Sequence, residues 1–487
     1  MNYVIGGDLG TSAIKLILVD QNGKTIKSVE ESYPLSFPEP GFSEQNPMDW
    51  KIALVKGLAE LSKDLDGEIV GIALDGQMHG LVALDENMEV IRPCILWNDS
   101  RSMKECEMLN EVYTKKRLLQ ETGNIAYPGF TLPKILWMKN HEIEHFKRIK
   151  HVLLPKDYLN FILTGKLYTD FSDAAGTLML DVKNRKWSQA MISLSELDES
   201  VMPEIVEAGS DLGSICPDIA SICNISHKCH IYQGAADNAA GAIGNGVIED
   251  NECNISLGTS GTIFIATDKF VYPENGAIHS FSSATGSNCL LACMLSAASS
   301  LKWFNDSILK ESDYNADQKL IREDMLGNNE VFFLPYLMGE RSPINDANSR
   351  GVFFGLSLDT KREDMTQAIL EGVAFALRDS FEAIKNMGVK ITGSYITGGG
   401  AKSPLWREIL ASVLNIPLYG IADSYGSSYG MALLCLVGQG YFSSLKEAKD
   451  QLIKVTSVTK PNEKLVPLYE KKYKKFATLY PGMKNLF

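Results

Sequence analysis

The sequence contains no run of about 20 consecutive apolar residues, the length that a membrane-spanning helix needs. Its first residues pass almost at once into a strand-like segment, without the basic and apolar regions of a secretory signal. We therefore expect a cytoplasmic protein with no membrane partner.

Clusters of basic residues are also missing. Acidic residues outnumber basic ones, which gives a formal net charge of −13 at pH 7, and no long basic stripe is interleaved with aromatic side chains. Proteins that bind nucleic acid neutralise its phosphates with basic surfaces of that kind. The charge therefore argues against nucleic acid as a partner.

A framework of closely spaced cysteine pairs is missing as well. The nine cysteines are scattered through the chain, which fits reduced thiols better than a disulfide framework. Cys216, Cys223, His227, Cys229 and His230 suggest a metal site, but their spacing departs from that of zinc ligands and leads directly into a strand. We expect free thiols there and no metal.

What the chain does have is enough length and apolar content for two domains. It has 487 residues, 45% of them hydrophobic, and strand-like and helix-like segments alternate as in α/β proteins. Gly244 and Gly246 mark a crossover. We expect one domain over 1–245, with a mainly helical insertion at about 102–225, and a second over 246–487.

One tetrapeptide, Leu-Gly-Thr-Ser, occurs twice, at 9–12 and at 257–260. Each copy precedes a run rich in β-branched residues, at 13–20 and at 261–268, so each half is predicted to open with a strand, a tight turn and a returning strand. Such turns present backbone N–H groups and hydroxyls to anionic oxygens. Two of them facing each other across a cleft would hold a polyphosphate.

A third glycine-rich turn, Gly398–Gly400, follows a strand predicted at 394–397 and precedes a helix. Glycine there lets the backbone approach a flat ligand closely, as in nucleotide sites. The stretch Gly6–Gly10 is similar to a dinucleotide fingerprint, but its glycines open onto a strand instead of a helix. NAD is therefore disfavoured.

The remaining segments place a second set of polar residues at strand ends. Gln77, Met78 and His79 follow a predicted buried strand, and in α/β sheets ligands bind beyond such strand ends. We expect these three residues to line a pocket. The pattern predicts helices at 47–61 and 365–387, and strands at 24–30, 68–74, 91–96 and 229–233.

Together these motifs resemble the FGGY carbohydrate kinases, a branch of the actin-like ATPase superfamily, over essentially the whole chain. The resemblance implies two ribonuclease-H-like α/β domains flanking a deep cleft, with ATP between them and the sugar on the side of the first domain. It rests on Lys134 and Trp137 within 129–140, and on residues 7–12, 76–80, 96–101, 154–158, 172–177, 236–241, 256–261, 339–343 and 398–401.

The resemblance also implies roles for individual residues. Asp237 takes the position of the catalytic base, and Asp8 that of the carboxylate that holds Mg²⁺. The implied sugar contacts are Met78, His79, Asp237 and Asn238. The implied ATP contacts are Gly10, Thr11, Ser12 and, less directly, Lys15 in the first turn, Gly258, Thr259 and Ser260 in the second, and Gly399, Gly400 and Ala401 around the adenosine.

Structural interpretations stand beside these roles. Asp237 with Asn238 also fits an Asx turn or a helix N-cap, and Asp8 fits a capping aspartate. Trp97 is interpreted as a filler of the core or of the cleft wall. Arg101 is interpreted as an ion-pair partner of Asp99 or of another local carboxylate.

The implied reaction is ATP-dependent phosphorylation of D-xylulose to D-xylulose 5-phosphate. Ribulose, gluconate and glycerol stay open as substrates, because one or two residues can re-tune a pocket built from hydroxyl contacts. A non-catalytic sugar sensor is a further alternative, although Asp237 is retained. Two departures from the family, Gly7 for a β-branched residue and Ala235-Ala236 for a glycine-rich approach to Asp237, leave the functional positions intact. A homodimer stays open, because no residue pattern fixes the oligomeric state.

Overall fold

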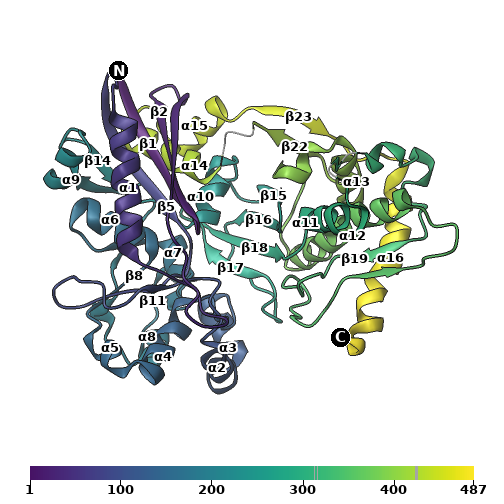
Figure 1. The fold of residues 1–487 in the computed structure, drawn as a ribbon, viewed down its shortest axis with the longest axis horizontal. Helices are drawn as coiled ribbons and strands as arrows, with labels where there is room; N and C mark the ends of the chain where they lie inside the picture. The colour runs from purple at the N-terminus through teal and green to yellow at the C-terminus, as the bar shows by residue number, and fades with distance from the viewer. Residues whose placement is uncertain (312, 315, 423–425) are drawn as a thin grey trace.

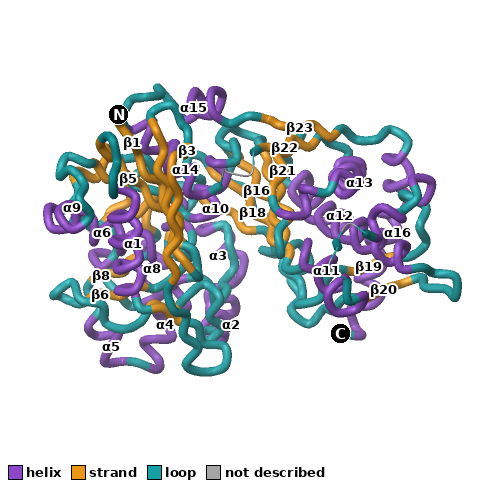
Figure 2. Tube along the Cα trace, turned by 45° about the horizontal axis from the view of Figure 1, so that its top comes forward, coloured by secondary structure: helices purple, strands orange, loops and turns teal. Residues whose placement is uncertain are grey.

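Two β-sheets lie side by side in the computed structural model, which describes residues 1–311, 313–314, 316–422 and 426–487 (Figure 1). Helices cover both sheets, and the strands form two separate groups in Figure 2. The predicted two-domain α/β fold is confirmed. The first sheet has the order β13 (Asp211–Ser214), β14 (His230–Tyr232), β5 (Glu68–Gly76), β1 (Asn2–Leu9), β2 (Ala13–Asp20), β3 (Thr25–Ser32).

The second sheet repeats the pairing pattern of the first. In both, the opening strand pairs antiparallel with the strand that follows it and parallel with a later one. Its order is β17 (His279–Ser282), β18 (Asn288–Met294), β16 (Gly261–Thr267), β15 (Cys253–Leu257), β21 (Ser394–Thr397), β22 (Leu418–Ile421), β23 (Val455–Thr459).

Both predicted hairpins are present. In the first, Leu9 pairs with Ile14 across residues 10–13, and in the second, Leu257 pairs with Gly261 across residues 258–260. The strand predicted at 394–397 has those bounds, and the one predicted at 24–30 is β3, shifted toward the C-terminus. The repeated tetrapeptide therefore marks equivalent turns of the two sheets.

One prediction about a strand was wrong, and the expected helical insertion also contains short strands. The strand predicted at 91–96 is reduced to β7 (Cys94–Ile95), because Pro93 lacks the N–H that a ladder needs. The insertion at 102–225 contains several strands of two to four residues, too short to carry a periodic signal. They are β8 (His151–Leu153), β9 (Tyr168–Asp170), β10 (Leu180–Asp181), β11 (Lys186–Trp187), β12 (Glu204–Val206) and β13, which extends the first sheet.

Local signals define the helices well. The helix predicted at 47–61 is α1 (Pro47–Ser62), which begins with proline after Asn46, whose side chain accepts from the N–H of Met48. The one predicted at 365–387 is α12 (Arg362–Asn386). The others are α2 (Met103–Met108), α3 (Lys115–Thr122), α4 (Thr131–His141), α5 (Ile143–Arg148), α6 (Pro155–Thr164), α7 (Phe171–Ala175), α8 (Gln189–Ser195), α9 (Pro217–Ile222), α10 (Asp237–Gly244), α11 (Ala298–Trp303), α13 (Pro404–Leu414), α14 (Ser427–Gly438), α15 (Leu445–Leu452) and α16 (Leu465–Met483).

The cysteine and histidine cluster near residue 223 takes part in ordinary packing. Cys223 and Cys229 are buried as free thiols, and His230 contacts the carboxylate of Asp211 at 2.8 Å. In the described ranges, no group of three His, Cys, Asp or Glu side chains is arranged to hold a metal ion by itself. The search of the same ranges also found no helix both long and apolar enough to cross a membrane.

Two helices join the halves of the molecule. α14 follows the second sheet in the chain but packs on β1 and β5 of the first sheet and against α10, between the two sheets in Figure 1. A Cβ on Gly430 would lie 2.1 Å from the carbonyl oxygen of Ala240, and one on Gly244 would lie 1.9 Å from that of Gly426. The helices therefore cross backbone against backbone. The domain boundary expected near residue 245 stays a prediction, since α14 belongs to the second half in sequence and contacts the first in space.

We predict that Gly430→Ala lowers the free energy of unfolding by about 1–3 kcal/mol, the usual cost of overpacking. The added methyl can be accommodated only if α10 and α14 move apart. Urea unfolding measures the loss. Gly241→Ala on α10 is the matched control, because its Cβ would meet no described atom within 4 Å. Alanine is the better helix former, so this control should be as stable as the parent or more so. Equal stability of the two variants would contradict the close crossing.

Candidate active site

Three neighbouring strands deliver carboxylates to one edge of the first sheet. β1 ends with Asp8 and Leu9, β5 ends with Asp75 and Gly76, and the chain leaving β14 reaches Asp237 as the first residue of α10. Asp8 and Asp75 are register partners in parallel strands, and Gly76 bridges to Ala236. Residues far apart in sequence are thereby gathered beside the first Gly-Thr turn.

Asp237 has the environment of a proton acceptor. Its Oδ1 accepts hydrogen bonds from the backbone N–H and the side-chain amide of Asn238, at 2.6 and 2.9 Å, and the residue is partly exposed. The N-cap of α10 is Ala236, so Asp237 does not hold the capping position. Burial, and then the charge of Asp8, raise the pKa of Asp237 to about 7.

Asp8 contacts both halves of the chain. The hydroxyl of Ser427, at the start of α14, donates to Asp8 Oδ2 at 2.6 Å. Asp75, the register partner of Asp8, was not among the site residues predicted from the sequence. A polar residue at the end of a buried strand is nevertheless a recognisable sign of a ligand site. Burial, and then the charges of Asp8 and Asp237, raise the pKa of Asp75 well above its usual range.

The first Gly-Thr turn is held by surrounding side chains. Gln45 Nε2 donates to the carbonyl of Thr11 at 2.6 Å, and the Tyr33 hydroxyl donates to the carbonyl of Gly10. Ser12 and Lys15 are exposed, Lys15 on β2 as the register partner of Asp8. The backbone carbonyls of the turn are therefore held by protein side chains, whereas Ser12 faces solvent.

The second turn and the third glycine-rich turn share a cavity. It measures ≈ 620 Å³, within the range of about 300–1,000 Å³ typical of small-molecule sites. Ser260 is exposed outside it, and Ala401 lies on a neighbouring cavity of ≈ 510 Å³. The larger cavity is lined by Gly258, Thr259, Ala298, Ser299, Leu301, Lys302, Tyr314, Gln318, Gly399, Gly400, Lys402, Ser403 and Trp406.

The ring of His79 is held by a hydrogen bond to the backbone of Gly176. Its Nδ1 lies 2.7 Å from the carbonyl of Gly176, so Nδ1 carries the proton and Nε2 is left as an acceptor. Burial lowers its pKa to about 3, so the ring is neutral. The ring of Phe130 meets it edge-on, with centroids 4.8 Å apart, and Phe281 of β17 lies at 6.1 Å.

The other predicted sugar contacts lie nearby. Met78 is buried, and the Asn238 amide that bonds Asp237 also lies 3.8 Å from the sulfur of Met78. The sequence did not predict a link between this region and the first turn. Gln77 Nε2 donates to Gln45 Oε1 at 2.9 Å, and Gln45 in turn bonds Thr11.

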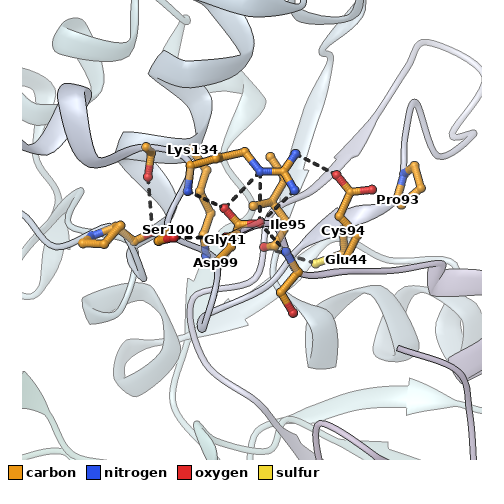
Figure 3. A network of polar contacts seen from close by, with 12 residues as sticks. Gly41, Glu44, Pro93, Cys94, Ile95, Asp99, Ser100 and Lys134 are labelled. Carbon is orange, nitrogen blue, oxygen red and sulfur yellow. Dashed lines mark hydrogen bonds and ion pairs between the residues drawn. The ribbon is translucent and has the colours of Figure 1, made fainter. Parts of the chain in front are cut away.

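Trp97 and Arg101 have different surroundings. Trp97 is 44% exposed, and its indole N–H donates to the Thr11 hydroxyl at 3.0 Å, so it lies beside the first turn and not in the core. Arg101 pairs with Asp99, as predicted, and with Glu44, both at 2.7 Å. Figure 3 shows part of this network, including Asp99, Glu44 and the neighbouring Lys134.

Lys134 is hydrogen-bonded to the backbone of His79. The buried ammonium donates to the carbonyls of His79 and Gly129 at 2.8 and 2.6 Å, and burial lowers its pKa to about 7. This contact helps to hold His79 at φ = 71°, a left-handed conformation that is uncommon for a residue with a side chain. The family signature around Lys134 is thus structural support for the pocket.

Comparison with known proteins identifies the family. Residues 3–244 and 253–438 match the N-terminal and C-terminal domains of the FGGY family of carbohydrate kinases. The chain belongs to the FGGY carbohydrate kinases. This kinase is 36% identical to the xylulose kinase of Bacillus subtilis (strain 168), over 100% of this chain and 98% of that one. Enzymes of this family take their phosphoryl group from ATP.

Two solved structures show how little the overall fold says about the sugar. The ligand-bound xylulose kinase of Lactobacillus acidophilus has a TM-score of 0.94 to this chain, at 27% identity and 99% coverage of both chains. The gluconate kinase of the same organism has a TM-score of 0.93, at 27% identity, with 99% of this chain and 98% of that chain covered. Substrate choice must therefore lie in the pocket residues.

We predict that Gly176→Ala impairs use of the sugar and leaves ATP binding unchanged. Its φ of −72° suits alanine, but the new Cβ would lie 2.7 Å from Nδ1 of His79 and displace the ring. A displacement of this size should lower kcat/KM for the sugar about ten- to hundredfold. Steady-state kinetics with each substrate varied in turn measure it, with Gly241→Ala as the control. Unchanged sugar kinetics would remove the His79 ring from the pocket.

Proposed function

We propose that this kinase transfers the γ-phosphoryl group of ATP to the 5-hydroxyl of D-xylulose, with Asp237 as the general base. Full-length similarity to xylulose kinases supports the substrate. The observation that carries the proposal is a partly exposed carboxylate with a pKa of about 7, between the His79 pocket and the first Gly-Thr turn. A base with such a pKa is half ionised near neutral pH and accepts a proton readily.

The chemistry asks little of the protein beyond position, charge and one proton. The sugar hydroxyl attacks the γ-phosphorus, the bond from phosphorus to the leaving oxygen of ADP breaks, and the hydroxyl proton passes to Asp237. The turns at 10–12 and 258–260 present N–H groups and hydroxyls to the phosphates. Gly399 and Gly400 line the cavity proposed for the adenosine.

The residues present also fit a magnesium ion. Carboxylate oxygens are the ligands that Mg²⁺ prefers, and the edge holds Asp8 beside Asp75. We propose Asp8 as the residue that holds the ion, directly or through water. When bound, Mg²⁺ neutralises part of the charge on the phosphates.

The pocket contributes to sugar choice through a hydrogen-bond acceptor. Nε2 of the neutral His79 ring can accept from one sugar hydroxyl, and the Asn238 amide lies next to Asp237. The same two contacts are compatible with gluconate, ribulose or glycerol. Full-length similarity to xylulose kinases is what favours xylulose over these alternatives.

We predict that Asp237→Asn lowers kcat by about two to four orders of magnitude while sugar and ATP still bind, because only proton transfer is removed. The parent enzyme should also lose kcat/KM for xylulose as the pH falls below about 7, since Asp237 is then protonated. His79, with a pKa of about 3, does not titrate in this range.

Pre-steady-state kinetics and calorimetry, together with a pH profile of both proteins, measure these effects. The acid limb near pH 7 should be absent from Asp237→Asn. Retention of more than about a tenth of kcat by the variant, or an acid limb that persists in it, would remove Asp237 from the role of base.

The substrate is tested by a coupled ADP-release assay over xylulose, ribulose, gluconate and glycerol. We expect the highest kcat/KM with D-xylulose. His79→Ala should lower that value about ten- to hundredfold, since a hydroxyl left unpaired costs about 1–3 kcal/mol, and should do much less to an analogue that lacks the contacted hydroxyl. A different preferred sugar would refute the xylulose assignment, and equal losses on every sugar would make His79 a purely structural residue.

A further inference from the structure

One short helix connects the proposed base with the proposed sugar pocket. α7 has five residues, and near its start the Ser172 hydroxyl oxygen accepts the backbone N–H of Ala236 at 3.0 Å. Ala236 directly precedes Asp237. At the other end of α7, the carbonyl of Gly176 lies 2.7 Å from Nδ1 of His79. The base and the pocket are therefore held by opposite ends of the same element.

The direction of the Ser172 hydroxyl follows from its two neighbours. A backbone N–H can only donate, so the hydroxyl oxygen is the acceptor toward Ala236, and the hydroxyl hydrogen is left for another group. That group is the carboxylate of Asp170, whose Oδ2 accepts this hydroxyl and also the backbone N–H of Ser172, the latter at 2.8 Å. Ser172 is buried, so these bonds are shielded from water.

The carboxylate of Asp170 is itself anchored in the protein interior. Its Oδ1 lies 3.0 Å from the ammonium of Lys156, which also contacts Asp157 at 2.5 Å. Asp170 ends β9, whereas Lys156 and Asp157 belong to α6, and all three side chains are buried. A continuous chain of polar contacts therefore leads from a buried ammonium through Ser172 to the residue before the base.

Stabilisation of α7 alone does not account for the Ser172 hydroxyl. Asp170 already caps this helix, because its side chain accepts the N–H of Ser172. The N-cap of α10 is Ala236, which has no side-chain oxygen to offer. In a capping box, a side chain of the same helix accepts the N–H of the N-cap residue, and here Ser172 of another helix does so. The hydroxyl therefore serves the start of α10.

We propose that Ser172 is a positioning residue for the general base. By holding the N–H of Ala236, its hydroxyl fixes the backbone from which Asp237 reaches the sugar hydroxyl. Proton transfer needs a hydrogen-bond distance between the two groups, and a misplacement of about 1 Å can cost about a hundredfold in rate. Because α7 also holds His79, the base and the sugar are positioned by one helix. The inference rests on the proposed role of Asp237.

The test measures the rate of phosphoryl transfer by rapid quench, in single turnovers of the full-length enzyme with ATP and the sugar preferred in the ADP-release assay. We expect Ser172→Ala to lower this rate about ten- to hundredfold, because the start of α10 loses its anchor. KM for ATP and for the sugar should stay within about threefold, since the ring of His79 keeps its bond to Gly176. Ser172→Cys repeats the test at similar volume, because a thiol is a weak acceptor.

Ser188→Ala is the matched control. The Ser188 hydroxyl makes the same pair of bonds at the start of α8: it donates to a carboxylate oxygen of Glu121 at 2.8 Å and accepts the N–H of Met191 at 3.2 Å. Ser188 is buried as well, and both partners lie outside the proposed site. This control should lose stability as Ser172→Ala does and keep the phosphoryl-transfer rate of the parent.

A double-mutant cycle shows whether Ser172 acts through Asp237. Once Asp237→Asn has removed the base, the position of that side chain no longer affects proton transfer. The further change Ser172→Ala should then lower the rate by less than about threefold. A residue that supports only the fold would lower the rate by the same factor in both backgrounds.

Each outcome decides the proposal. A rate within about threefold of the parent in either folded Ser172 variant overturns it, as does an equal loss in Ser188→Ala or in both backgrounds of the cycle. Failure of both Ser172 variants to fold also overturns it, because Ser172 would then serve the fold. Asp237→Asn alone tests the proposed function: if it keeps more than about a tenth of kcat, the role of Asp237 fails whatever the Ser172 variants show.

Discussion

The parallel pairing of β5 with β1 is the constraint on which the rest of the site depends. It places Asp75 beside Asp8, and the pairing of β14 with β5 extends the edge to Asp237. A carboxylate at such an edge would repel its neighbours in water as well as in protein, so the arrangement is costly in the empty enzyme. Under the proposed function, the divalent cation of the nucleotide would offset part of this repulsion when it binds.

The halves of the molecule are joined by contacts that leave little freedom at the crossing. α14 comes from the second half of the sequence, lies on the first sheet, and begins with Ser427 bonded to Asp8. The start of α14 is thereby tied directly to the residue that is proposed to hold the cation.

The sequence predicted what depends on local pattern. The two Gly-Thr hairpins, α1 and β21 have strong turn, cap or alternation signals and were predicted within a residue or two. The roles assigned to Asp8 and Asp237 came from family resemblance, those of the three turns also came from their glycine-rich sequence, and the structure shows where these residues lie. Their chemistry stays a prediction.

The sequence could not predict what depends on distant contacts. β13 joins the first sheet only because β14 is present to pair with it, and its four residues carry no periodic signal of their own. Asp75 looks like any polar residue at the end of a strand until the register places it against Asp8. The docking of α14 on β1 joins segments more than 400 residues apart, and no local pattern encodes it.

The glycine contacts between α10 and α14 have a consequence for how mutational surveys of this enzyme are interpreted. Gly430 and Gly244 touch backbone atoms, so every side chain placed there pushes the two helices apart. Substitutions at these positions would lower the amount of folded enzyme and so reduce growth on a selective sugar, as loss of activity also would. A survey scored by growth alone would thus rank two residues that contact no ligand among the essential ones, and only a parallel measurement of protein abundance would separate the two classes.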